Sequence, residues 1–144
     1  MTAKQYLRQL ERINHIINSK QLQLDELRVI GSGFKAIDYA ADRVQSSPRD
    51  RMADIMARWV DLEEEINEII DRYVDTKNRI INEVNSLQDA RYMSILYKRY
   101  VEFKPLVVVA YEMNYDYKWT CKLHGDALQT FDKLILQRTR QNTI

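Results

Sequence analysis

The stretch PRDRMADIMARWVDLEEEINEIIDRYVDTKNRIINEVNS, residues 48–86, repeats apolar side chains at alternating steps of three and four. Steps of this size place residues along one side of an α-helix. The row continues for about four heptads, which predicts one long helix whose apolar stripe needs a partner. Glu63, Glu64, Asn67 and Glu68 lie off the row and are expected to face solvent. The row consists of Met52, Ile55, Trp59, Leu62, Ile66, Ile69, Tyr73, Thr76 and Ile80.

The beginning of the chain has the same period, with one interruption at Lys20. A helix is therefore expected there, ending at Gly31-Ser32-Gly33, where two glycines favour a break. The two stripes predict an antiparallel helical hairpin with Trp59 buried inside it. One helix cannot cover the whole of the longer stripe, so a homo-oligomer is also expected. The first row consists of Tyr6, Leu10, Ile13, Ile17, Lys20, Leu24 and Leu27.

Between these rows lies a connector, residues 31–50. Phe34, Ile37, Tyr39 and Ala40 are compatible with a short helix within it. At its end, Ser46-Ser47-Pro48 has the form of a helix start, with serine as the N-cap and proline in the first turn.

The composition supports an all-α class. Among 144 residues there are 3 glycines and 2 prolines, too few for the many turns of a sandwich or barrel, and 30% of the residues are charged, as in long solvated helices. No run approaches the ~20 apolar residues of a membrane span. The first residues resemble charged amphipathic sequence rather than a signal segment. We therefore expect no membrane partner and a cytoplasmic location.

The last third predicts three shorter helices, at about 89–101, 105–113 and 117–136. Asp89 and Asp116 are the expected caps, and Asn114 suits the left-handed conformation that ends a helix. We therefore divide the chain into a coiled-coil-like hairpin, residues 1–87, and a second module, residues 88–144.

Two helices joined by a short turn, the second basic near its start, form the outline of a helix-turn-helix. Residues 91–144 carry 9 basic and 5 acidic side chains, a net charge of +4, which suits an anionic partner. In this outline Val109, Met113 and Tyr115 pack against the second helix. Such outlines also arise by chance in helical proteins. The face expected to meet bases and phosphates consists of Tyr117, Lys118, Cys121 and Lys122.

Five stretches carry a resemblance to known proteins: VQSSP (44–48), VDLEEEIN (60–67), LYKRYVE (96–102), VAYEMNY (109–115) and KLHGDAL (122–128). They resemble a family of small phage and prophage proteins from Firmicutes, which implies a host bacterial cell. The C-terminal module of that family is similar to region 4 of the bacterial sigma-70 type factors, the helix-turn-helix that reads promoter −35 elements. The resemblance implies DNA binding through Tyr117, Lys118, Cys121 and Lys122, which match sigma positions facing bases and phosphates. At Phe103 that module commonly has glycine.

No constellation of residues indicates an enzyme, a metal site or a cofactor. Cys121 is the single cysteine and has no partner thiol for zinc. His15 and His124 are isolated in sequence, and no acidic partner for either can be argued. His124 is therefore interpreted as a structural residue or a minor phosphate contact.

Two hypotheses for function remain open at this point. The first is a phage-derived, DNA-binding transcriptional regulator. The second is a structural or adaptor protein without sequence-specific DNA reading, either a polymerase-binding or a DNA-packaging component, with RNA polymerase as a candidate partner. Basic residues on the predicted recognition face favour the first, while Val107 and Val108, on a face that should be solvated, favour the second.

Overall fold

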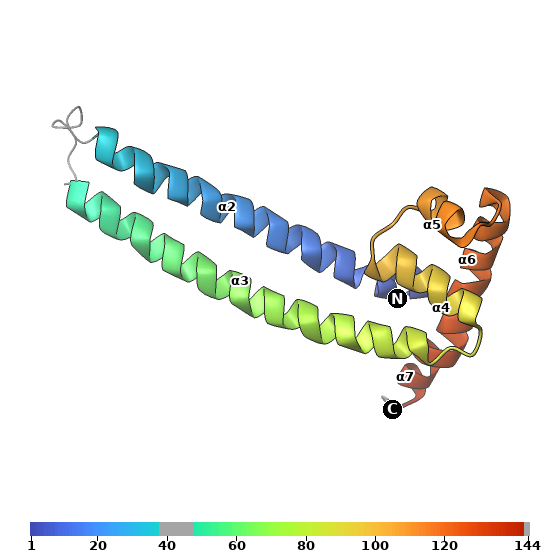
Figure 1. The fold of residues 1–144 in the computed structure, drawn as a ribbon. Helices are drawn as coiled ribbons and strands as arrows, with labels where there is room; N and C mark the ends of the chain where they lie inside the picture. The colour runs from blue at the N-terminus through green and yellow to red at the C-terminus, as the bar shows by residue number, and fades with distance from the viewer. Residues whose placement is uncertain (38–47, 143–144) are drawn as a thin grey trace. The chain divides into compact units, whose positions relative to one another are not determined.

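The computed structural model describes residues 1–37 and 48–142, and every regular element in these ranges is helical, which confirms the all-α class. Tyr39, Ala40 and the expected N-cap serines, Ser46 and Ser47, lie outside the described residues. The elements are α1 (Ala3–Leu7), α2 (Gln9–Ile37), α3 (Pro48–Asn85), α4 (Ala90–Leu96), the π-helical η1 (Tyr97–Val101), α5 (Leu106–Met113), α6 (Tyr117–Phe131), the π-helical η2 (Asp132–Leu136) and α7 (Gln137–Asn142), shown in Figure 1.

The chain forms two compact units. Unit 1 comprises residues 1–13 and 73–144, and unit 2 comprises residues 14–72. The sequence-based division between residues 87 and 88 thus falls inside unit 1. The reason is that the last part of α3, with Ile80 and Val84, belongs to the same hydrophobic cluster as α4 and α6.

Unit 2 is an antiparallel hairpin of α2 and α3, as the two apolar rows predict (Figure 1). Leu24 and Ile66, one from each row, are buried. Charged side chains also link the helices: the Lys20 ammonium lies 2.9 Å from the Glu65 carboxylate, and the Arg28 guanidinium lies 5.3 Å from the centre of the Trp59 ring. Pro48 is the first residue of α3, where its fixed φ suits a helix start.

The expected helix end at Gly31-Ser32-Gly33 is wrong, because α2 continues through these residues to Ile37. None of the described glycines has a positive φ, so Gly31 does not turn the chain. A glycine inside a helix costs about 1 kcal/mol relative to alanine, which weakens a helix without ending it.

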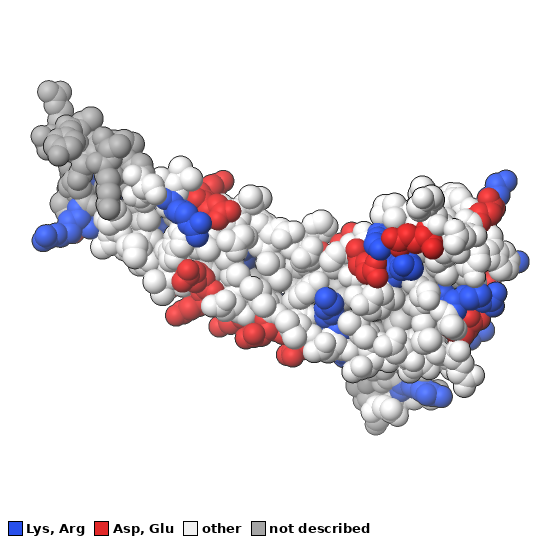
Figure 2. Space-filling model, in the orientation of Figure 1, with Lys and Arg blue, Asp and Glu red and all other residues white. Residues whose placement is uncertain are grey.

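Trp59 is only partly buried, against the expectation that the hairpin would enclose it. Its indole N–H donates a hydrogen bond of 2.8 Å to Glu63 one turn later. The flank of α3 beyond it is acidic, with Asp61, Glu64 and Glu68 exposed, and Figure 2 shows Asp and Glu side chains along this edge of unit 2. The predicted solvation of Glu63, Glu64, Asn67 and Glu68 is confirmed.

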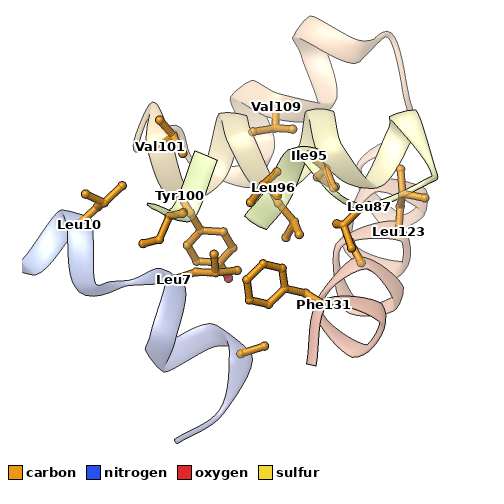
Figure 3. Close-up of a cluster of buried hydrophobic side chains, with 14 of the residues drawn as sticks. Leu7, Leu10, Leu87, Ile95, Leu96, Tyr100, Val101, Val109, Leu123 and Phe131 are labelled. Atoms are coloured by element: carbon orange, nitrogen blue, oxygen red, sulfur yellow. The ribbon is translucent and has the colours of Figure 1, made fainter. Parts of the chain in front are cut away.

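Unit 1 is built around a cluster of buried side chains from α1, α2, α3, α4, η1, α5, α6 and η2 (Figure 3). Leu7, Tyr100 and Phe131 come from three distant parts of the sequence and point toward one another in its centre. The Tyr6 ring packs 5.9 Å from that of Phe131, and its hydroxyl donates a 2.6 Å hydrogen bond to Glu83. These contacts hold the start of the chain against α3 and α6.

The shorter helices begin and end close to the predicted positions. Asp89 caps α4 through a 2.9 Å hydrogen bond from the Arg91 backbone N–H, and Asn114 ends α5 in the left-handed conformation, with φ 58° and ψ 39°. Pro105 is the N-cap of α5 rather than part of its first turn. Asp116 is the N-cap residue of α6, but its carboxylate makes no capping hydrogen bond.

Phe103, in the loop between η1 and α5, has φ 59°, a left-handed conformation rare for a bulky residue. Its side chain packs against the cluster of unit 1, and the following Lys104 N–H donates a 3.0 Å hydrogen bond to the Lys98 carbonyl. Packing therefore holds Phe103 in a backbone conformation that glycine would adopt without strain.

We expect the Phe103→Gly protein to be more stable than Phe103→Ala by about 1 kcal/mol, because both lose the ring but only alanine keeps a Cβ in the left-handed region. Urea unfolding at equilibrium measures the difference. At Glu102, where φ is −91°, alanine should be at least as stable as glycine, and this pair is the control. Equal stabilities for the two Phe103 variants would contradict the expectation.

Candidate nucleic-acid interface

The α5–α6 pair is fixed by a buried contact and a hydrogen-bonded turn. Val109 and Ala110 of α5 and Leu123 and Ala127 of α6 are all buried. At the turn, the Tyr115 N–H donates a 2.9 Å hydrogen bond to the Ala110 carbonyl. This bond is possible because Asn114 turns the chain in the left-handed conformation. The direction in which α6 leaves the turn is therefore set by the core of unit 1.

Lys118 and Lys122 are exposed on the accessible side of α6. Tyr117, at the start of the helix, is 51% exposed, and Cys121 is partly buried at the edge of the buried side. A hydrogen bond with Cys121, one turn later, raises the pKa of the Tyr117 phenol above its usual value. The structure thus brings Tyr117, Lys118, Cys121 and Lys122 together on the first two turns of one helix.

Trp119 belongs to the same surface and was not among the predicted residues. It is 42% exposed, and the Lys122 ammonium lies 5.7 Å from the centre of its ring. An exposed indole with a lysine over it is held by a cation–π contact that also keeps the charge near the surface. The signal available in the sequence was the aromatic residue between two lysines.

The charges around this face leave its lysines available. Within residues 1–37 and 48–142, neither Lys118 nor Lys122 forms an ion pair, whereas the nearby acid Glu112 is engaged by two lysines. Hydrogen bonds from Lys104 and Lys98, at 2.7 and 2.9 Å, hold the pKa of Glu112 below its usual value. The acid on α5 is thus neutralised locally, and Lys118 and Lys122 stay outside these ion pairs. The acid on α6 itself is Asp126, four residues after Lys122.

His124 lies on the buried side of α6, 9% exposed. Its Nε2 atom is 2.9 Å from the Tyr100 hydroxyl, and the two rings are stacked 5.6 Å apart. Burial, reinforced by Arg99, Lys4 and Arg8, lowers its pKa to about 4. These contacts support the structural alternative for His124, because a buried ring is not free to contact a phosphate.

A second exposed surface lies on α5. Val107 is 64% exposed, Val108 39% and Tyr111 84%. Isolated apolar residues on a surface are ordinary, but three on one short helix are a feature of contact surfaces. This face is apolar, unlike the basic face of α6.

No protein-family model matches this chain, and no curated protein or solved structure matches it. In the part of the chain that the structure describes, no group of three or more His, Cys, Asp or Glu side chains is placed to hold a metal ion. Over the same residues, no helix is both long enough and apolar enough to cross a membrane.

Proposed function

We propose that α5, the Asn114 turn and α6 form a helix-turn-helix that binds duplex DNA, and that the protein is a phage-derived transcriptional regulator. The observation that carries this proposal is the accessible face of α6, where Lys118 and Lys122 lack acidic partners and sit on a helix fixed by a buried α5 contact. A rigid helix with free cations suits a groove lined by phosphates.

In this proposal, α6 is the recognition helix and enters the major groove. Lys118 and Lys122 contact phosphates or base edges, while Tyr117 and Cys121 lie on the side of α6 that faces the nucleobases. Trp119 packs beside Lys122 and limits the positions that its ammonium can reach. Self-association is part of the same proposal, because dimeric helix-turn-helix proteins contact two half-sites.

The exposed face of α5 supports a second candidate function, an adaptor or structural protein that binds RNA polymerase or a DNA-packaging component. Val107, Val108 and Tyr111 present an apolar surface that DNA would leave uncovered. Protein partners bury such surfaces. The two candidates differ in whether α6 or α5 carries the affinity.

We expect Lys118→Ala and Lys122→Ala each to weaken binding to duplex DNA several-fold without unfolding unit 1, because both side chains are exposed. A variant that makes one phosphate contact fewer releases about one counterion fewer when it binds. The slope of log K against log salt concentration should therefore become smaller in magnitude by about 1. Electrophoretic mobility shifts on random and promoter-like duplexes, over a series of salt concentrations, measure both quantities.

The matched control is Lys133→Ala, which removes an exposed lysine from η2, farther along the same helical segment. It should change DNA affinity less than either α6 variant. If neither α6 variant changes affinity, or if the wild type does not bind at ~50 mM salt, where attraction to phosphate is strong, the DNA-binding proposal is wrong. A Val107→Asp variant that then loses a protein partner would favour the adaptor.

A further inference from the structure

Gly125 lies in the interior of α6, and nothing within the described chain requires a glycine there. Its φ is not positive, so the backbone conformation is open to any residue. A Cβ built on it would meet nothing within 4 Å, so no neighbouring element packs against the bare backbone. Glycine in a helix interior is less favourable than alanine. The fold of unit 1 would therefore be more stable with a side chain at this position.

Gly125 lies on the accessible side of α6. Gly125 is exposed, whereas its neighbours Leu123, His124 and Ala127 are buried. It follows Cys121 by four residues and Lys122 by three, spacings that place residues on one side of a helix. The accessible face of α6 therefore has a gap in its row of side chains, one helical turn beyond Lys122 and about two turns beyond Lys118.

We propose that Gly125 is the point of closest approach between α6 and the sugar–phosphate backbone of bound duplex DNA. This inference rests on the proposed function and adds the residue that sets how deeply α6 lies against its partner. A glycine lets another backbone approach a helix more closely than any side chain allows. Lys118 and Lys122, exposed on the turns before Gly125, supply the positive charge that attracts the phosphates of the DNA backbone. A close approach of the DNA backbone at Gly125 thus accounts for a glycine at a position where alanine would make the fold more stable.

The test is Gly125→Ala, for which stability and binding should change in opposite directions. The melting temperature of the protein alone should rise by about 3–6 °C, because alanine is the better helix former and its Cβ has room. Affinity for duplex DNA should fall by about tenfold or more, because the methyl group keeps the backbone of the DNA away from the helix. Gly125→Leu should lower affinity further while α6 stays folded.

Gly31→Ala is the matched control. Gly31 also lies inside a helix, α2, and a Cβ on it also meets nothing within 4 Å. This variant should raise the melting temperature without changing DNA affinity, which separates a general effect of helix stabilisation from an effect at the α6 face.

The outcomes separate this inference from the proposed function. If the wild type binds duplex DNA, weakened by Lys118→Ala, but Gly125→Ala binds as tightly as the wild type, the close approach is wrong and the DNA-binding proposal stands. If Gly125→Ala lowers the melting temperature, the fold requires the glycine and the inference is overturned. If the wild type binds no DNA, both proposals fall together.

Discussion

Replacing Phe131 by alanine is expected to lower the free energy of unfolding of unit 1 by about 3–5 kcal/mol. The Phe131 ring is fully buried and lies at the meeting point of α1, η1 and α6, where its neighbours include Tyr6 and Tyr100 (Figure 3). Truncation removes the transfer free energy of the ring and leaves a cavity that three elements would have to move to fill. Since domains are stable by only about 5–15 kcal/mol, a large part of the stability would be lost.

Equilibrium unfolding in urea, followed by circular dichroism, measures this effect. Gln129→Ala is the control, because Gln129 is on the same helix but exposed, and its replacement should change stability by less than about 0.5 kcal/mol. A loss below 1 kcal/mol for Phe131→Ala would mean that the ring is not enclosed as described. Weakened DNA binding by this variant at temperatures where it remains folded would show that the core also aligns α6.

The second large effect is a loss of stability in mild acid that depends on His124. Its pKa is about 4 in the folded chain, against an ordinary value of 6.5, because burial and the cations Arg99, Lys4 and Arg8 disfavour the imidazolium. The unfolded chain therefore binds a proton more readily than the folded one. The contribution of neutral His124 to the free energy of unfolding is therefore fully present above pH ~6.5. It decreases by about 3 kcal/mol as the pH falls to 4.

Other groups facing this ring also bear on its titration. The Tyr100 hydroxyl is hydrogen bonded to it and has a raised pKa because of burial, so it stays neutral throughout this range. Glu11 lies 4.0 Å from Arg99 and partly offsets that cation. Since carboxyl groups in general change protonation in acid, a single stability curve would mix their effects with that of His124.

His124→Gln isolates the histidine, because the amide accepts or donates a hydrogen bond to Tyr100 without titrating. We expect the unfolding free energy of the wild type, relative to that of His124→Gln, to fall by about 3 kcal/mol between pH 7 and pH 4. Urea titrations at half-unit steps of pH give the two curves. Curves that run parallel over this range would refute the assignment of the low pKa to the buried ring.

The hairpin was predictable because its information is local and repeated. Each apolar row of α2 and α3 recurs every three or four residues, so one error, such as Lys20 within the row, leaves the period visible. The end of α2 was not predictable from glycines alone. Gly31 costs stability wherever it lies in a helix, and only the contacts of its neighbours decide whether the helix continues past it.

The four residues predicted for the α6 face lie together because α6 begins at Tyr117, as predicted, and the helix period then sets the side on which each residue lies. The exposure of Trp119 and Gly125 was not predictable from the sequence. An aromatic residue or a glycine at helical spacing is compatible with both the buried and the exposed side of a helix. The pairing of Tyr100 with His124 joins residues 24 apart on different helices, which no local pattern encodes.

The chain contains two tryptophans, Trp59 in unit 2 and Trp119 in unit 1. Tryptophan emission, excited at wavelengths that tyrosine does not absorb, is therefore a two-part optical signal. In it the Trp59→Phe protein reports on unit 1 and the Trp119→Phe protein on unit 2. Their environments also differ: the Trp59 indole N–H is bound to Glu63, while Trp119 is 42% exposed beside Lys122. A polar or anionic ligand at α6 should quench or shift the emission of Trp119 and leave that of Trp59 unchanged. Each unit therefore carries its own spectroscopic marker.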